Sequence, residues 1–178
     1  MTTNEIADII LNSMCERRFP VFLTTASIGG MHEADVLGIN KAGFIYEYEI
    51  KRSRSDFKAD FKKKHKHRNL KERISHRIYN VWENGKITNK TQKVIMIPSR
   101  FFYACEENLI SPEEIPEYAG LVYVNEVSGL TEIKKAKLLH KEKAPEYVYK
   151  AIASTLCQRI TYGCSYFTFK FNKLKTTK

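Results

Sequence analysis

The sequence predicts a mixed α/β fold in which a central mixed β-sheet is flanked by helices. Two observations predict it. Apolar residues recur at helical spacing near both ends of the chain, and several short segments between them alternate or concentrate apolar residues as strands do. A chain of 178 residues, of which 43% are hydrophobic, can bury one core. We therefore expect a single domain over residues 1–178, with its core over about residues 3–162.

The N-terminal part of the chain predicts a helix followed by two strands. Helical spacing of apolar residues favours a helix over residues 3–17, which Thr3 can cap. Residues 21–26 and 33–39 are rich in strand-forming residues, and Gly29-Gly30 between them is typical of a tight turn.

A third strand is expected over residues 44–51, after a hairpin turn at Asn40–Gly43. Its side chains should point alternately to the two faces of the sheet. One face then carries the residues that we expect to meet the core, Phe44, Tyr46, Tyr48 and Ile50, and the other carries Ile45, Glu47, Glu49 and Lys51. This second set puts charge on a face where strands are usually apolar or neutral.

The rest of the chain predicts a basic helix over about residues 55–75, capped by Ser53 or Ser55. An added β-hairpin follows over about residues 77–97, because Asn84-Gly85 is typical of a two-residue turn. Three strands, a helix and an edge strand are then expected over residues 100–106, 120–125, 131–135, 145–162 and 166–171.

Positive charge is concentrated in one segment of the chain. The net charge is +10, and residues 51–73 hold eleven Lys or Arg against three acids. Such a cluster favours a polyanion such as nucleic acid, although a solvated helix face or an anionic lipid surface also fits it. No apolar run approaches the roughly 18 residues of a membrane span, and the N-terminus lacks the basic start of a signal peptide. We expect a cytoplasmic protein, in a bacterial cytosol or a phage-infected host cell.

The hairpin over residues 33–51 holds residue types that suit phosphodiester hydrolysis. Asp35 lies on its first strand, and Glu49 and Lys51 share a face of its second strand. Two carboxylates and the Ile50 carbonyl can bind a divalent metal ion, and a lysine beside them can orient water and counter new negative charge. An exposed strand with an ordinary Glu–Lys pair is the alternative.

The stretch EADVLGINKAGFIYEYEIKRSRSDFKADFKKKHKH resembles the nuclease core of the PD-(D/E)XK superfamily. Its run EIKRSRSDFKADFKK is similar to MmcB-like DNA-repair proteins and to small phage nucleases, which carry a Ser-Arg-x-Asp-Phe signature, here at residues 53–57. The likeness extends over about residues 33–135. It implies a restriction-endonuclease-like core, with Asp35, Glu49 and Lys51 catalytic and with Mg²⁺ (or Mn²⁺) bound by Asp35, Glu49 and the Ile50 carbonyl.

The resemblance also implies DNA as the partner, an endonuclease activity in repair, recombination or phage DNA metabolism, and a possible homodimer. Members of the superfamily often use one more acid from the first helix, for which Glu5 and Glu16 are candidates, with Glu33 as a further possible ligand. For Asp56 and Asp60 we prefer a structural role. The residues expected to contact phosphates are Arg52, Arg54, Lys58, Lys62 and Lys66.

Two other functions remain open at this point. The chain could be a non-catalytic nucleic-acid-binding protein on a nuclease fold, or an inhibitor or partner-binding protein of the phage type. Trp82 could stack on a base, although a place in the core of the hairpin is the plainer interpretation.

Overall fold

The computed structural model describes residues 1–26, 33–73, 75–83, 86–94 and 97–162. The chain divides into two compact units, Met1–Ala144 and Pro145–Lys178, each of which is described by itself. A single domain over residues 1–178 stays a prediction. Three of the sequence predictions, the turns at Gly29-Gly30 and Asn84-Gly85 and the edge strand at 166–171, lie outside the described residues.

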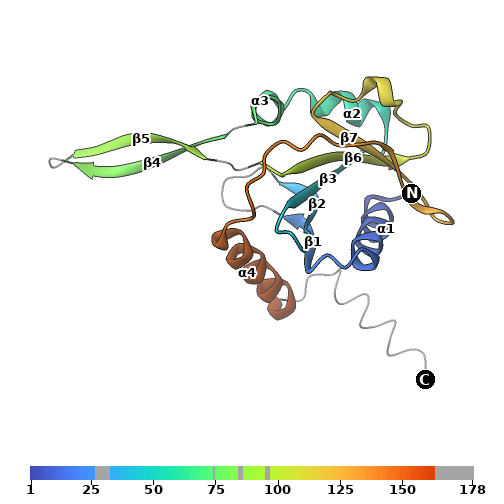
Figure 1. Cartoon of the computed structure of the whole chain (residues 1–178), viewed down its shortest axis with the longest axis horizontal. Coiled ribbons are helices and arrows are strands. Elements are labelled where there is room, and N and C mark those ends of the chain that lie inside the picture. The colour runs from blue at the N-terminus through green and yellow to red at the C-terminus, as the bar shows by residue number, and fades with distance from the viewer. Residues whose placement is uncertain (27–32, 74, 84–85, 95–96, 163–178) are drawn as a thin grey trace. The chain divides into compact units, whose positions relative to one another are not determined.

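A six-stranded mixed sheet forms the centre of the first unit, as the sequence predicts (Figure 1). Its strand order is β1-β2-β3-β6-β7-β8. β3 pairs parallel with β6, and β6 pairs parallel with β7, whereas the other neighbours are antiparallel. The strands are β1 (Val21–Ala26), β2 (Ala34–Ile39), β3 (Ile45–Ile50), β6 (Arg100–Glu106), β7 (Ala119–Asn125) and β8 (Gly129–Lys134).

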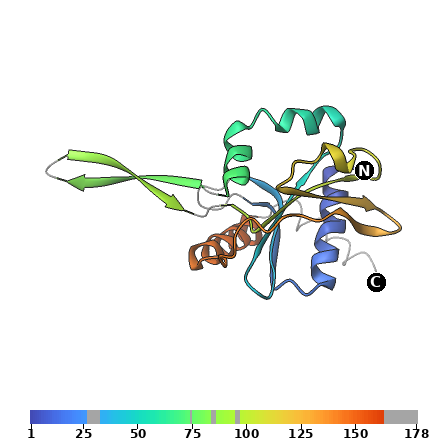
Figure 2. The same ribbon diagram turned by 45° about the horizontal axis from the view of Figure 1, so that its top comes forward.

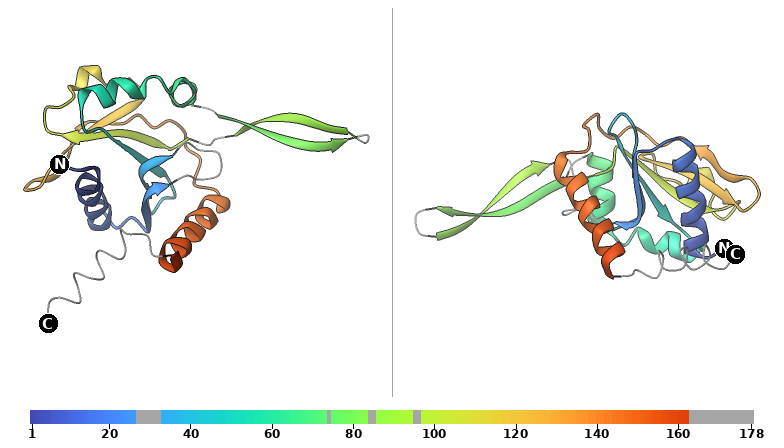
Figure 3. Two further views of the ribbon diagram at one scale, coloured as in Figure 1. Left: turned by 180° about the vertical axis from the view of Figure 1, so that it is seen from behind. Right: turned by 90° about the horizontal axis from the view of Figure 1, so that it is seen from below.

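Helices cover both faces of this sheet (Figures 1 and 3). α1 (Thr3–Glu16) packs on one face, where its apolar residues join Tyr48, Ile50 and Phe102 in one core cluster. α2 (Arg54–Asp60) and α3 (Lys64–Glu72) lie over the other face, where Phe57 and Leu70 join Phe101 and Tyr103. The central strands are therefore buried on both faces, which is typical of parallel sheets under helices.

This arrangement changes one expectation about β3. Tyr48 and Ile50 do meet a core, as predicted. The opposite face is buried as well, because α2 and α3 cover it, so Glu47 and Glu49 are enclosed rather than solvated. Buried carboxylates are costly unless they are paired, and this makes the covered face of β3 the unusual feature of the fold.

The first helix, Thr3–Glu16, covers nearly the predicted range of residues 3–17, but its N-cap lies one residue earlier than the sequence predicts. Thr2, and not Thr3, is its N-cap: its side chain accepts a hydrogen bond from the Glu5 backbone, and the Glu5 carboxylate accepts one from the Thr2 backbone. This reciprocal pair is a capping box, which satisfies two backbone donors that a helix end leaves open.

The predicted basic helix over residues 55–75 is two helices, α2 and α3, capped at the start by Ser53. The break has a geometric reason. Residues along a helix rotate by about 100° each, so in one continuous helix Phe57 and Asp60 would face a different direction from Lys66 and Leu70. Because all four side chains are buried, the chain turns at 61–63 and reorients the second helix.

The predicted hairpin forms a sheet of its own from β4 (Ser75–Glu83) and β5 (Lys86–Val94) (Figure 2). Trp82 is opposite Ile87 in its register, and both are exposed, Trp82 to 71%. The interpretation of Trp82 as hairpin core is therefore wrong.

The second unit contains α4 (Glu146–Tyr162), close to the predicted helix at 145–162. In the described part of the chain no helix is both long and apolar enough to cross a membrane.

Candidate active site

Asp35 and Glu49 stand across from each other where β2 and β3 come apart. The last paired positions are Val36 with Tyr48, and continuing this register by one residue sets Asp35 opposite Glu49. Beyond this point a side chain takes the place of a backbone acceptor: Asp35 Oδ2 accepts a hydrogen bond of 2.7 Å from the Ile50 backbone N–H. A single side chain thus ties the start of β2 to the end of β3.

Lys51 completes the predicted set. Its Nζ donates to Glu49 Oε1 at 2.9 Å, and its backbone N–H donates to the Ala104 carbonyl, which keeps this end of β3 attached to β6. Lys51 and Glu49 are only 3% and 4% exposed. The structure therefore brings Asp35, Glu49 and Lys51 to one place, and their catalytic role stays a prediction.

Two more lysines contact the same carboxylate. Lys66 Nζ donates to Glu49 Oε2 at 2.6 Å and lies 3.9 Å from Glu47 Oε1. Lys63 Nζ donates to Glu49 Oε1 at 3.2 Å. Both oxygens of Glu49 thus accept from ammonium groups.

Asp60 is a third buried acid of this cluster, after Glu47 and Glu49. It makes more contacts than the structural role expected for it would need. Its Oδ1 lies 3.3 Å from Lys51 Nζ and 3.1 Å from Lys63 Nζ. Its Oδ2 accepts from the Tyr103 hydroxyl at 2.9 Å and lies 3.3 Å from His67 Nε2. Lys51 therefore contacts Asp60 as well as Glu49, and the two carboxylates together hold its ammonium.

The electrostatics of the cluster separate its carboxyl groups. Burial, and then the charge of Glu49, raises the pKa of Asp35 from 3.8 to about 6. Burial alone would also raise the pKa of Glu49, but Lys66 and Lys51 outweigh it and hold that pKa below its usual value. The pKa of Asp60 is lowered strongly, because His67, Lys66 and Lys51 outweigh its burial. Asp35 is thus the group whose negative charge is least compensated.

The donors around Asp35 and Glu49 fit a magnesium or manganese ion in kind, since these ions prefer carboxylate and carbonyl oxygens. The raised pKa of Asp35 supports this fit, because a cation between the two carboxylates would relieve their repulsion. No three His, Cys, Asp or Glu side chains of the described residues are grouped to hold a metal ion. Asp35, Glu49 and the Ile50 carbonyl would therefore be the protein donors, in competition with the ammonium groups at Glu49.

The five residues predicted to contact phosphates differ in their surroundings. Arg52, Lys58 and Lys62 are exposed. Arg54 forms a two-pronged pair with Glu114, at 3.0 and 2.6 Å. Lys66 is buried against Glu49 and lies 4.8 Å from the centroid of the Phe101 ring. A phosphate contact by Lys66 would require its ammonium to leave that pair, so its burial argues against this assignment.

None of the three candidate additional acids makes a hydrogen bond or ion pair with the cluster, as far as the described residues go. Glu5 is engaged in the capping box, although the charge of Arg52 contributes to its lowered pKa, after the hydrogen bonds from Thr2. Glu16 and Glu33 are exposed. Asp56 accepts from the Arg52 backbone at 3.3 Å and lies 3.9 Å from Lys51 Nζ, which agrees with the structural role expected near a helix start.

Comparisons with known proteins give a fold and no function. No protein-family model matches the chain, and no curated protein matches it. Among solved structures the chain is similar to the SPO1766 protein of unknown function from Silicibacter pomeroyi. The two share 18% sequence identity, the match covers 90% of each chain, and the TM-score is 0.59. At this identity the likeness shows that the two proteins share a fold.

Proposed function

We propose that this protein is a metal-dependent endonuclease that hydrolyses DNA phosphodiester bonds. The observation that carries the proposal is the convergence of Asp35, Glu49 and Lys51 at the point where β2 and β3 separate. The sheet supports a restriction-endonuclease-like core. β1, β2 and β3 come before the α2–α3 crossover, and β6 after it pairs parallel with β3, so Glu49 on β3 belongs to a central strand. Exposed cations around the start of α2 support a polyanionic substrate.

The residues of the chain would divide the work as follows. Asp35, Glu49 and the Ile50 carbonyl would hold a Mg²⁺ or Mn²⁺ ion. When bound, the ion would act as a Lewis acid on water and on the phosphate oxygen. Lys51, fixed between Glu49 and Asp60, would orient the attacking water and counter the charge that develops on the phosphate. Tyr103 and His67 hold Asp60 in place and act on the reaction only through it.

A cleavage assay tests this proposal. Wild-type protein should nick plasmid or branched DNA with Mg²⁺ or Mn²⁺ and not with EDTA. Lys51→Ala should lose cleavage by at least about 100-fold, the usual effect of removing one group that stabilises charge in a transition state. Lys41→Ala, which removes an equal charge from the exposed turn at the other end of β2 and β3, should cleave normally.

Because Lys51 is buried, the folding of its variant is checked by circular dichroism, and Lys51→Met, which preserves most of its volume, is assayed beside it. Cleavage by both variants at the wild-type rate would refute catalysis at this site.

A second function is favoured by the three ammonium groups at Glu49, which occupy both oxygens of the predicted metal ligand. The chain would then be a nucleic-acid-binding protein that keeps the nuclease arrangement without its metal. It should bind DNA equally in Mg²⁺ and in EDTA and cleave none. Mg²⁺-dependent nicking that Lys51→Ala abolishes would exclude it.

A further inference from the structure

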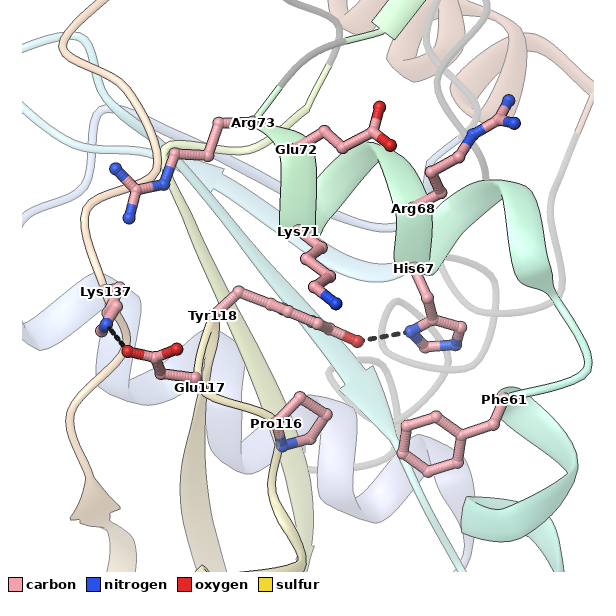
Figure 4. A pocket seen from close by; sticks show the side chains of 10 residues that line it. All are labelled: Phe61, His67, Arg68, Lys71, Glu72, Arg73, Pro116, Glu117, Tyr118 and Lys137. Carbon is pink, nitrogen blue, oxygen red and sulfur yellow. Dashed lines mark hydrogen bonds and ion pairs between the residues drawn. The ribbon is translucent and has the colours of Figure 1, made fainter.

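A pocket beside the charged cluster combines aromatic and cationic side chains (Figure 4). Phe61, from the turn between α2 and α3, stacks on the His67 ring with 5.0 Å between ring centroids. Tyr118, which precedes β7, also lines the pocket and points toward His67, and its hydroxyl is 2.6 Å from His67 Nδ1. Phe61 is 39% exposed, so the pocket offers an aromatic surface to solvent.

Cations surround this aromatic surface. The lining includes Arg68, Lys71, Arg73 and Lys137 against two carboxylates, Glu72 and Glu117. Glu117 is paired with Lys137, and Figure 4 shows Glu72 pointing away from Tyr118. The ammonium of Lys71 points toward Tyr118 in the same view. Arg68 also points away from Tyr118 in Figure 4 and contacts His65. The uncompensated charge that remains at the pocket, on Lys71 and Arg73, is therefore positive.

The pocket is connected to the candidate active site through one side chain. His67 contacts Tyr118 with one ring nitrogen, while its other ring nitrogen lies 2.9 Å from the Asp60 carbonyl and 3.3 Å from its carboxylate. Asp60 in turn holds Lys51. A ligand in the pocket would thus be connected to Lys51, the residue expected to act on the phosphate, through His67 and Asp60.

We propose that this pocket binds one unpaired nucleotide of the DNA substrate, with its base against Phe61 and Tyr118 and its phosphate near Lys71 and Arg73. The inference rests on the proposed function and names its substrate class: DNA with a single-stranded extension or branch. A base inside a duplex is stacked on both faces and cannot enter a pocket, whereas an unpaired base can stack on aromatic side chains while lysine and arginine follow its backbone.

Binding measured in EDTA tests the inference separately from cleavage. The probes are a labelled blunt duplex, the same duplex with a single-stranded extension, and that extension with abasic nucleotides, which keeps the phosphates and removes the bases. Fluorescence anisotropy with the full chain should show tighter binding to the extended duplex than to the blunt one. Abasic nucleotides should remove most of this preference, because the stacked base is lost.

Two variants locate the effect in the pocket. Phe61→Leu keeps an apolar side chain and removes the ring, and it should weaken binding to the extended duplex roughly tenfold, a typical effect for one stacked base. Lys71→Ala should make the affinity for the extended duplex less sensitive to salt, by the amount expected for the loss of about one phosphate contact. Lys41→Ala, with the same loss of charge on a distant turn, should change neither.

Equal binding of blunt and extended duplexes, or full preference in Phe61→Leu, would overturn the inference. Failure of the nuclease proposal would be seen differently, as absence of nicking in Mg²⁺ while the preference in EDTA persists.

Discussion

Asp35→Asn changes a carboxyl group whose pKa the fold raises from 3.8 to about 6, chiefly through burial and then through the charge of Glu49. A carboxyl group that loses its proton near 3.8 when unfolded and near 6 when folded is penalised in its ionised form by about 3 kcal/mol. The penalty is absent below about pH 4, grows as the pH rises, and is complete above about pH 7. Asparagine has no charge to bury, and its oxygen can still accept from the Ile50 N–H.

The variant should therefore be more stable than wild type at neutral pH and nearly equal to it at about pH 4. The expected gain in the free energy of unfolding approaches 3 kcal/mol above about pH 7. Urea unfolding of both proteins in EDTA, at intervals from about pH 4 to about pH 8, measures the difference and removes the contribution of other titrating groups. At the same time the variant should lose Mg²⁺-dependent cleavage, since it lacks one predicted metal ligand.

A destabilised Asp35→Asn at neutral pH, or a difference that does not change with pH, would refute the reasoning. Either result would mean that the Asp35 charge is compensated in the fold, and the argument for a cation between Asp35 and Glu49 would lose its basis.

Three further predictions follow from the packing and the charges. Glu49→Gln should destabilise the protein by about 3–5 kcal/mol in urea unfolding, because the buried ammonium of Lys66 keeps an acceptor there but loses the negative charge that compensates it at 2.6 Å. Gly120→Ala should cost about 1–3 kcal/mol and lower the melting temperature, because the new Cβ would lie 2.7 Å from the Ala136 backbone nitrogen, which cannot rotate away. Lys63→Gln should tighten Mn²⁺ binding in isothermal titration calorimetry while changing stability little, and weaker binding would contradict the proposed competition.

Much of the sheet and the first three site residues could be predicted because their signals are local. Alternation along residues 44–51 sets the faces of β3, and a short turn at Asn40–Gly43 fixes its pairing with β2. Asn40 makes this turn through its own side chain, which accepts from two backbone N–H groups, and Gly43 has a positive φ of 87°. Together these place Asp35 opposite Glu49 without information from the rest of the chain.

The remaining members of the site could not be predicted in the same way. The sequence gives the charge of Lys63 and Lys66 but not their burial, which depends on the break between α2 and α3. For this reason the sequence alone predicts that Lys66 contacts phosphate, as the exposed lysines and arginines around it are expected to do. A signal was present all the same: Asp60 interrupts the basic run with a carboxylate that can pair with lysine, as it does with Lys51 and Lys63. Tyr118 comes from a loop far along the chain, and no local pattern connects it to His67.

The balance of charge in the cluster indicates which lysine a metal ion could replace. Asp56 is left out of this count because its side chain is 47% exposed to solvent. The remaining four carboxylates face three ammonium groups, so with Asp35 ionised the set keeps one negative charge: the acids are Asp35, Glu47, Glu49 and Asp60, and the lysines are Lys51, Lys63 and Lys66. A divalent ion in place of one lysine makes the set neutral. The side chain of Lys66 is 3% exposed, so its departure would require the core to open. The side chain of Lys63 is 57% exposed, and its ammonium can move into solvent at little cost. Lys63 is therefore the group that a metal ion would displace, and Lys63→Gln mimics that exchange.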